Sequence, residues 1–457
     1  MAEPPTSSPA FDGRAFARHL ADVSHAWTVA MEAADIDAVV VPAGNAGFYY
    51  QDDIAPPFRP NPGFAQWVPD DGTEHCLLVY RPGEKPRLFF HQEADYWHLP
   101  AAVPDWADAE FQVEVGGDAD ALAVAAIAAA ARAGRVAYIG PPGDVPGNAE
   151  RVAVNPDALT VRLQYARAYK TDFEIAAVRR ATDIGVAGHL AARDAFFDGA
   201  SELDIHFAYL NASRQTDAGL PYPNIVAQNE HAGVLHYQHR DPHPPSKRRS
   251  FLIDAGGRHL GYASDITRTY SARGDTFAEL IDALDEKQRA LIDGIRPGIS
   301  YVELHERMSR SIGELLARFG LVRCEADTAF EAGITDVFFP HGLGHLLGLQ
   351  THDVGGWLAA PDGRVSPPPE RYPALRLTRR VEPRQVFTIE PGIYFIPQLL
   401  GLAAKAPYAG EIAWPAVESF LPCGGIRVED DVLVTDDGCE NLTRPAFAFH
   451  RREPAEA

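Results

Sequence analysis

The first third of the chain alternates between helical spacing of apolar residues and short, continuous apolar runs. Residues 14–35 repeat apolar side chains with the period of an amphipathic helix, and residues 36–44 form an apolar run that ends near a glycine. Residues 75–90 are typical of two strands around a Pro-Gly turn, and residues 121–131 of an alanine-rich helix that precedes a strand at 135–143. Strands that alternate with helices in this way indicate an α/β domain with a mainly buried sheet.

The pattern changes near residue 166, where longer helical segments begin. A long amphipathic helix is predicted over residues 171–197, another helix begins at Ser201, and two more lie within 276–319. Three of these helices begin at capping-box spacing, in which the N-cap residue and the residue three positions later satisfy free N–H groups. The pairs are Thr171 and Glu174, Ser201 and Asp204, and Ser300 and Glu303.

Short strand-like runs lie between and after these helices. They cover residues 248–257, 263–272, 386–396 and 424–435. A curved, mainly antiparallel sheet backed by the helices accounts for this order of elements. Because 457 residues are many for one hydrophobic core, we expect two domains, an α/β domain over 1–165 and an α+β domain over 166–457.

Composition and charge narrow the classes of function. Hydrophobic residues make up 46% and charged residues 23% of the chain, as in soluble globular proteins, and the formal net charge is −22 at pH 7. Such an acidic surface argues against nucleic acid or an anionic membrane as a partner. The longest apolar run, at 121–131, is too short to span a bilayer, and the first residues do not resemble a signal peptide. Four cysteines without a Cys-x-x-Cys pair indicate a reduced, cytoplasmic protein.

Four acidic residues lie inside the strand-like runs of the second domain. Asp254 follows Phe-Leu-Ile, Asp265 comes eleven residues later, and Glu390 and Glu429 lie in "FTIEPG" and "IRVEDDVLVT". A carboxylate among apolar residues is costly to bury unless it is paired, hydrogen-bonded or bound to a metal. Each one alone could be a strand-end cap or an ion-pair partner, but four in one domain favour a shared metal site.

The stretch "HGLGHLLGLQTHDVGG", residues 341–356, contains three histidines. They could be metal ligands, a substrate-binding rim or a glycine-rich turn with incidental histidines. His341 and His345 are four residues apart, but Gly342 and Gly344 disfavour a helix there, so an extended or looping segment is expected. Two Asp, two Glu and one His suit a pair of divalent ions such as Mn²⁺ or Co²⁺, and cysteine-free ligands argue against structural zinc.

Several motifs occur in the same order as in a known family. "IDAGGRHLGYASDITRT", "HGLGHLLGLQTHDVGG", "TIEPGIYF" and "GGIRVEDDVLVT" resemble the metal and catalytic motifs of the M24 pita-bread metallopeptidases. "YKTDFEIA", "LPYPNIVAQNEHAGVLHY" and "LRLTRRVEPRQVFTIEPGIYFI" are similar to the bacterial Xaa-Pro dipeptidases, or prolidases, of the PepQ type. The resemblance covers essentially all of the second domain and, more weakly, residues 51–69. It implies a creatinase-like α/β N-terminal domain followed by a pita-bread catalytic domain.

The resemblance implies a hydrolase that releases C-terminal proline from Xaa-Pro dipeptides and holds two divalent ions, with Mn²⁺ expected and Co²⁺ as the alternative. Asp254 would bind one metal, while Asp265 and Glu429 would bridge both. His345 and Glu390 would complete the other metal. A hydroxide between the ions would attack the scissile carbonyl, and Glu390 would carry its proton to the departing prolyl nitrogen.

The resemblance also assigns residues to the substrate. His352, and with it His341, would donate a hydrogen bond to the carbonyl oxygen as it becomes an oxyanion. Arg376 would bind the free carboxylate of the dipeptide, with His236 as a second contact. A solvated charge is the alternative for Arg376, because two more arginines follow it closely.

Three further residues take supporting roles under the same resemblance. Arg427 would orient the bridging ligands from the strand that carries Glu429, and Tyr222 would line the pocket for the residue before proline. Asp53 corresponds to an acidic residue that, in relatives, reaches the active site of the partner subunit. A homodimer is therefore expected.

Rival functions stay open at this point. An aminopeptidase P would use the same metals to remove the first residue from longer Xaa-Pro peptides, although "VLHY" and "LRLTRR" favour a dipeptidase. A non-catalytic peptide-binding protein on the same fold would be expected to lack at least one metal ligand, and none is missing. Hydrolysis of organophosphates is a side activity that the same bridging hydroxide would support.

Overall fold

The computed structural model describes residues 11–93, 95–146 and 152–450. Contacts within the chain divide it into two units. The first extends to Ala166 and includes Thr171–Ala176, and the second consists of Arg167–Lys170 and the chain from Ala177 onwards. Helix α6 (Asp172–Asp198) therefore begins in the first unit and continues into the second. Within the described residues, no helix is both long enough and apolar enough to cross a bilayer.

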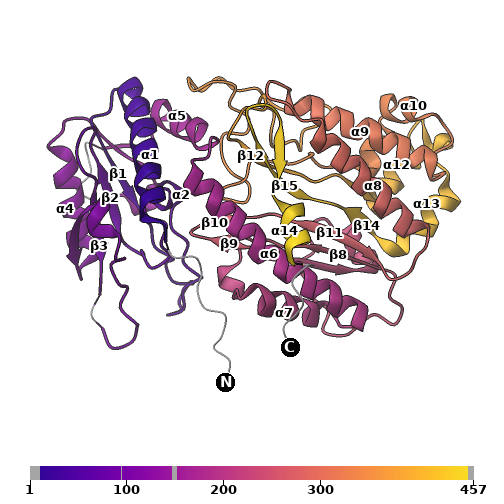
Figure 1. Cartoon of the computed structure of the whole chain (residues 1–457), viewed down its shortest axis with the longest axis horizontal. Coiled ribbons are helices and arrows are strands. Elements are labelled where there is room, and N and C mark those ends of the chain that lie inside the picture. The colour runs from indigo at the N-terminus through magenta and orange to yellow at the C-terminus, as the bar shows by residue number, and fades with distance from the viewer. Residues whose placement is uncertain (1–10, 94, 147–151, 451–457) are drawn as a thin grey trace. The chain divides into compact units, whose positions relative to one another are not determined.

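The first unit is built on a six-stranded mixed sheet with the strand order β4-β3-β2-β1-β5-β6, of which β1, β2 and β3 are labelled in Figure 1. Its strands are β1 (Ala38–Pro42), β2 (Leu77–Tyr80), β3 (Arg87–His91), β4 (Gln112–Gly116), β5 (Val136–Tyr138) and β6 (Val152–Val154). Its helices are α1 (Gly13–Ala34), α2 (Pro62–Ala65), α3 (Ala107–Glu110), α4 (Ala119–Ala131) and α5 (Asp157–Arg167). Val79 packs in a cluster with residues of α4, whereas the hydroxyl of Tyr80 lies 2.6 Å from Thr28 Oγ1 of α1. Because successive strand residues face opposite sides, α1 and α4 cover opposite faces of the sheet.

The second unit contains several small antiparallel sheets. Their strands lie between the helices and together follow a curve (Figure 1). One sheet joins β7 (Ile225–Gln228), β8 (Ser250–Asp254) and β11 (Thr267–Ser271), and another joins β12 (Val386–Ile389), β15 (Asp430–Val434) and β16 (Cys439–Asn441). Two pairs are β9 (Arg258–His259) with β10 (Tyr262–Ala263) and β13 (Gly392–Tyr394) with β14 (Gly425–Arg427). A bridge between Thr267 and Glu429 connects the first sheet to the second. The predicted mainly antiparallel sheet is confirmed.

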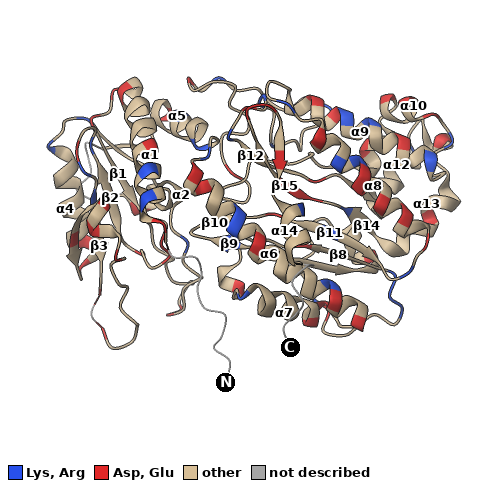
Figure 2. Ribbon diagram, in the orientation of Figure 1, with Lys and Arg blue, Asp and Glu red and all other residues tan. Residues whose placement is uncertain are grey.

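Helices cover these strands from two sides (Figure 1). Residues of α6 and α7 (Glu202–Ser213), such as Ala192 and Ile205, share one core cluster with Val226 and Ile253 of the sheet. Residues of α8 (Thr276–Asp293) and α9 (Tyr301–Arg318) form a larger cluster with β12 to β15. In Figure 2, acidic and basic positions recur along the ribbons of α8 and α9. The remaining helices are α10 (Ala326–Glu331), α11 (Ile334–Phe338), α12 (Pro397–Ala403), α13 (Trp414–Phe420) and α14 (Thr443–His450).

Of the three predicted capping boxes, the first forms both of its reciprocal hydrogen bonds and the second forms one of them. Thr171 N donates to Glu174 Oε2 at 2.7 Å while Glu174 N donates to Thr171 Oγ1 at 3.3 Å. At the start of α7, the N–H of Asp204 donates to Ser201 Oγ at 3.1 Å. The prediction for Ser300 is wrong, because its side chain makes no capping hydrogen bond. The N–H of Tyr301 donates to the carbonyl of Arg379 instead, so main-chain contacts satisfy the start of α9.

His305 on α9 makes stability depend on pH. It is only 2% exposed, and its ring lies against Phe339 and Tyr372, with ring centroids 5.3 and 4.4 Å away. Burial lowers the pKa of His305 from 6.5 to about 4. The unfolded chain therefore binds more protons than the folded chain between these values, so stability falls as the pH drops from 6.5 towards 4.

We expect His305→Leu to reduce this dependence. The thermal denaturation temperature, measured with a chelator present so that metal release plays no part, should fall less steeply between pH 6.5 and 4 than in the parent. His239→Leu is the matched control, because His239 is exposed. Equal slopes for the parent and His305→Leu would contradict the prediction.

Candidate metal centre

The first two candidate carboxylates lie on neighbouring strands. Asp254 is the last residue of β8, and Asp265 comes two residues before β11. These strands pair antiparallel with Thr267 opposite Asp254, so the turn between them brings both carboxylates to the same end of the sheet. The hydroxyl of Tyr222 lies between them, donating to Asp254 Oδ1 or Asp265 Oδ1 at 2.8 and 2.5 Å.

The other two carboxylates lie where one long hairpin ladder is interrupted. Ile389 of β12 pairs with Asp430 of β15, and further along Gly392 of β13 pairs with Arg427 of β14. Glu390 and Glu429 fall in the gap between these pairings. Because neither belongs to a regular strand pair, both side chains can turn from the ladder towards the first two carboxylates.

His345 reaches the same place from an extended segment, as the glycines around it predict. Its N–H donates to Thr388 Oγ1 at 3.2 Å, and its carbonyl accepts from Thr388 N at 3.0 Å, so the segment lies along β12. Gly344 has φ +158, and a Cβ there would lie 2.2 Å from the carbonyl oxygen of Thr388. Only glycine allows this close approach of the two main chains.

The imidazole of His345 is oriented for metal binding. Its Nδ1 lies 3.0 Å from the carbonyl oxygen of Leu346, and since a carbonyl can only accept, Nδ1 carries the hydrogen. In the neutral ring, Nε2 then presents a lone pair. It lies 3.3 Å from Asp265 Oδ2 and 3.4 Å from Glu390 Oε1, so lone pairs face one another. A cation between them removes this repulsion.

The electrostatics of the cluster also fit bound cations. One ligand atom each from Asp265, His345 and Glu429 lies within 4.8 Å of the others. Burial and the neighbouring carboxylates raise the pKa of Asp265 and Glu429 well above the usual range, and burial, together with the charge of Asp265, raises the pKa of Glu390 to about 7. Four carboxylates around one buried Arg427 leave a surplus of negative charge, which divalent ions compensate.

Arg427 holds the ligands in place through three hydrogen bonds. It donates to Asp254 Oδ2 at 2.6 Å, to Tyr394 Oη at 2.8 Å and to Thr267 Oγ1 at 3.1 Å. The hydroxyl of Thr267 in turn donates to Glu429 Oε2 at 2.6 Å. One guanidinium thus connects two of the four carboxylates, and no sequence pattern marked Tyr394 and Thr267 as members of this network.

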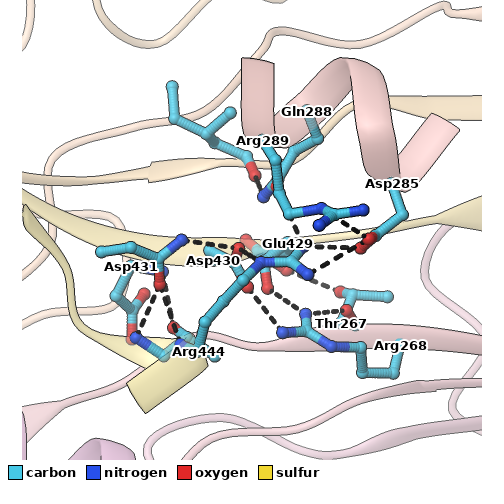
Figure 3. Close-up of polar contacts among 12 residues, drawn as sticks. Thr267, Arg268, Asp285, Gln288, Arg289, Glu429, Asp430, Asp431 and Arg444 are labelled. Atoms are coloured by element: carbon cyan, nitrogen blue, oxygen red, sulfur yellow. Dashed lines mark hydrogen bonds and ion pairs between the residues drawn. The ribbon is translucent and has the colours of Figure 1, made fainter. Parts of the chain in front are cut away.

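A second polar network supports Glu429 from behind (Figure 3). Arg268 donates to the carbonyl of Glu429 at 2.7 Å and to Asp430 Oδ1 at 2.6 Å. Arg444 donates to Asp430 Oδ2 at 2.6 Å. Although burial opposes it, these two arginines lower the pKa of Asp430 to about 2. Asp431 accepts the N–H of Asp265 at 3.2 Å, so consecutive residues secure both predicted bridging ligands.

The residues predicted to contact substrate surround the same cluster. His236, His341, His352 and Arg376 line one cavity of about 280 Å³ together with all five predicted metal ligands. The ring of His352 lies 4.4 Å from that of His345, a predicted ligand, at an interplanar angle of 88°. The structure therefore brings together residues that lie up to almost two hundred positions apart in the sequence.

The two outer histidines differ in their freedom to donate. Both ring nitrogens of His341 are engaged, Nδ1 with the carbonyl of Gly342 at 2.8 Å and Nε2 with Tyr394 Oη at 2.9 Å. His352 lines the cavity, and part of its side chain remains exposed there. The partial loss of water around the ring and the nearby His345 lower its pKa to about 3. A neutral His352 keeps one N–H for a substrate oxygen, whereas His341 has no ring nitrogen left over in this arrangement.

The structure separates the three clustered arginines. Arg376 is exposed and lines the cavity. Arg379 is buried and donates to Tyr169 Oη at 2.7 Å, and Arg380 donates to the carbonyl of Gly298 at 2.6 Å. Among the described residues, no hydrogen bond or ion pair is found for the Arg376 guanidinium, so it is available to a ligand.

Two predicted residues lie outside the cavity wall. Tyr222 directs its hydroxyl to the carboxylates of Asp254 and Asp265 and is not part of the lining. Asp53 is exposed on the first unit, where its N–H donates to Asp52 Oδ1 at 2.8 Å. The role of each toward a substrate stays a prediction.

Three comparisons relate the chain to known proteins. The model of metallopeptidase family M24 matches residues 176–436, and the model of the Xaa-Pro dipeptidase N-terminal domain matches residues 14–165. The chain is 43% identical over 439 residues to the Xaa-Pro dipeptidase of Stenotrophomonas maltophilia strain K279a, which covers 95% of this chain and 98% of that protein. It is 42% identical over 435 residues to the Xaa-Pro dipeptidase of Pseudoalteromonas haloplanktis, with 94% and 97% covered.

The fold is also similar to solved structures. Aminopeptidase PepP of Pseudomonas aeruginosa superposes with a TM-score of 0.70 at 24% identity, covering 95% of this chain and 99% of that one. The low-pH form of aminopeptidase P from E. coli gives a TM-score of 0.71 at 21% identity, covering 97% and 100%. At these identities the likeness concerns the fold alone.

Proposed function

The chain belongs to metallopeptidase family M24 and is a hydrolase, and we propose that it cleaves Xaa-Pro dipeptides at the imide bond, releasing C-terminal proline. The relatives that bear the name Xaa-Pro dipeptidase match it over nearly its whole length. The cavity of about 280 Å³ is small for a ligand pocket and suits a dipeptide better than a longer chain.

Divalent ions belong to the proposal as cofactors. Asp254, Asp265, His345, Glu390 and Glu429 would hold two of them, and the mixture of oxygen ligands with one imidazole favours Mn²⁺, with Co²⁺ next. When bound, such ions lower the pKa of a water and polarise a carbonyl oxygen.

The side chains around this centre then have separate tasks. Glu390 lies at the edge of the cavity and would carry a proton to the departing prolyl nitrogen. His352 would donate its free N–H to the carbonyl oxygen as negative charge develops there. His341 would act mainly by holding Tyr394, and through it Arg427, because its own ring nitrogens are engaged.

The observation that carries the choice of substrate is the unpaired Arg376 at the cavity. A guanidinium binds a carboxylate through two parallel hydrogen bonds, and a dipeptide has its free carboxylate one residue beyond the cut. A longer peptide has a neutral amide at that point, which leaves the guanidinium unmatched. This favours a dipeptidase over an aminopeptidase P.

The test compares three substrates with Mn²⁺-loaded protein. We expect rapid cleavage of an Xaa-Pro dipeptide and much slower cleavage of its amide and of the same dipeptide extended by one residue. The free dipeptide and its amide differ only in the C-terminal group, so the ratio of their kcat/KM values reports recognition of the carboxylate directly. Equal or faster cleavage of the extended peptide would show an aminopeptidase P, and no cleavage of any of the three would favour a non-catalytic protein.

Four finer points belong to the same proposal. The domains would divide at 1–165 and 166–457, in keeping with the ranges of the two family models. The protein would act as a cytoplasmic homodimer, with Asp53 reaching the partner's site. Hydrolysis of organophosphates would be a side activity of the same centre.

A further inference from the structure

A buried carboxylate outside the metal centre organises one wall of the cavity. Glu202, the first residue of α7, is only 1% exposed and lies away from the metal ligands in the sequence. Within the part of the chain that the structure describes, its two oxygens accept hydrogen bonds from the segment 228–241 alone. Leu235 and His236, in the middle of that segment, line the cavity.

The two oxygens of Glu202 hold opposite ends of this segment. Oε1 accepts from Gln228 N at 2.8 Å and from His231 Nδ1 at 2.7 Å, near the beginning. Oε2 accepts from Tyr237 Oη at 2.8 Å and from Asp241 N at 3.0 Å, at the end. One carboxylate therefore closes the segment into a loop.

Turn hydrogen bonds from Val234 N to the carbonyl of His231 and from Tyr237 N to the carbonyl of Val234 also shape the loop, and Tyr237 packs in a small core cluster. The rings of His231 and Tyr237 stack with centroids 4.6 Å apart, so the two side chains bound to Glu202 also pack on each other. Val234 is 54% exposed, and His236 is exposed as well. Because Tyr237, the neighbour of His236, donates to Glu202, the position of His236 in the cavity wall is coupled to the hydrogen bonds that Glu202 accepts.

From this geometry we infer that Glu202 is a positioning residue for substrate binding: it holds the 228–241 segment so that His236 and Leu235 form the cavity wall. The inference rests on the proposed function, because it assigns to this wall the contact with the dipeptide. Glu202 does not line the cavity, and its hydrogen-bond partners are in the 228–241 segment, so it would act through His236.

The substitution Glu202→Gln tests this with little change in shape. A glutamine offers one oxygen and one NH₂ group where the carboxylate has two acceptors. Whichever way the amide turns, its NH₂ faces a main-chain N–H, that of Gln228 or that of Asp241. One end of the segment must therefore be released, and an uncompensated N–H remains.

Kinetics give the first measurement. We expect Glu202→Gln to raise KM for the dipeptide by roughly tenfold or more, with a much smaller change in kcat and unchanged metal content. His236→Ala should cost clearly less in the Glu202→Gln background than in the parent, because His236 is already displaced there. Asp204→Asn is the matched control, since it removes an exposed carboxylate from the same first turn of α7.

Hydrogen exchange gives a second measurement that does not depend on activity. Amide exchange in 228–241 should be faster in Glu202→Gln than in the parent or Asp204→Asn, while exchange in 341–356 stays the same. An unchanged KM with full additivity of the His236→Ala effect would overturn the inference, as would unchanged exchange. If the parent cleaves no dipeptide, the proposed function fails, and exchange still decides whether Glu202 holds the loop.

Discussion

Glu429→Ala should abolish dipeptide hydrolysis and lower the content of bound divalent ions. Glu429 is buried beside Asp265 and His345, and it accepts a hydrogen bond from Thr267, which Arg427 also holds. Under the proposed function this carboxylate would serve two ions, and its removal would take a ligand from both, so we expect kcat/KM to fall by at least about a thousandfold.

The control for this variant is Glu440→Ala. Glu440 is also acidic and lies on β16, which pairs with the strand that follows Glu429, but its carboxylate is 42% exposed and bound to Arg179. Losing an exposed ion pair costs at most about 1 kcal/mol of stability, so activity and metal content should remain near those of the parent. A Glu429→Ala protein that kept both its ions and its activity would exclude Glu429 as a bridging ligand.

Arg376→Ala should weaken cleavage of the dipeptide by about a hundredfold or more while metal content stays intact. A guanidinium that meets a free carboxylate in a cavity forms a two-pronged, charge-assisted contact, which acts on binding and therefore chiefly on KM. Discrimination between the free dipeptide and its amide should shrink in the same variant, because the group that distinguishes them is gone.

Arg380→Ala is the matched control for Arg376→Ala. Arg380 is also exposed and lies only four residues away, but it donates to the carbonyl of Gly298 and does not line the cavity. It should leave KM and the preference for the free acid unchanged. Full retention of that preference in Arg376→Ala would instead assign the carboxylate to His236 or another basic group.

The sequence predicted the helices in which apolar residues recur at a regular spacing. It did not predict strands that form only because they pair with a neighbouring strand. Helices such as 14–35 and 171–197 follow from the spacing of their apolar residues, and they are observed as α1 and α6. The edge strands β4 and β6 escaped notice, since edge positions exposed to solvent carry no continuous apolar run. At Ser300 the sequence predicted a cap that is not formed. The capping spacing cannot reveal that the main-chain carbonyl of Arg379 already accepts the N–H at the start of this helix.

Some residues of the candidate site could likewise be predicted from the sequence, whereas others could not. Acidic residues among apolar ones marked Asp254 and Glu429, because burying such groups demands compensation. The interruption of the hairpin that turns Glu390 and Glu429 inward depends on register, which no local pattern expresses. Tyr and Thr are common residue types in strands, so only their contacts with Arg427 distinguish Tyr394 and Thr267. The choice among three neighbouring arginines likewise required the cavity.

We propose that two Asp, two Glu and one His side chain hold the ions on which dipeptide cleavage depends. They are Asp254, Asp265, His345, Glu390 and Glu429. The most direct measurement is to strip the protein of metal, titrate it with Mn²⁺, and record bound ions per chain and hydrolysis of an Xaa-Pro dipeptide together. We predict no activity in the stripped protein and activity that rises as about two ions bind per chain. Full activity in the chelated, metal-free protein would contradict the account.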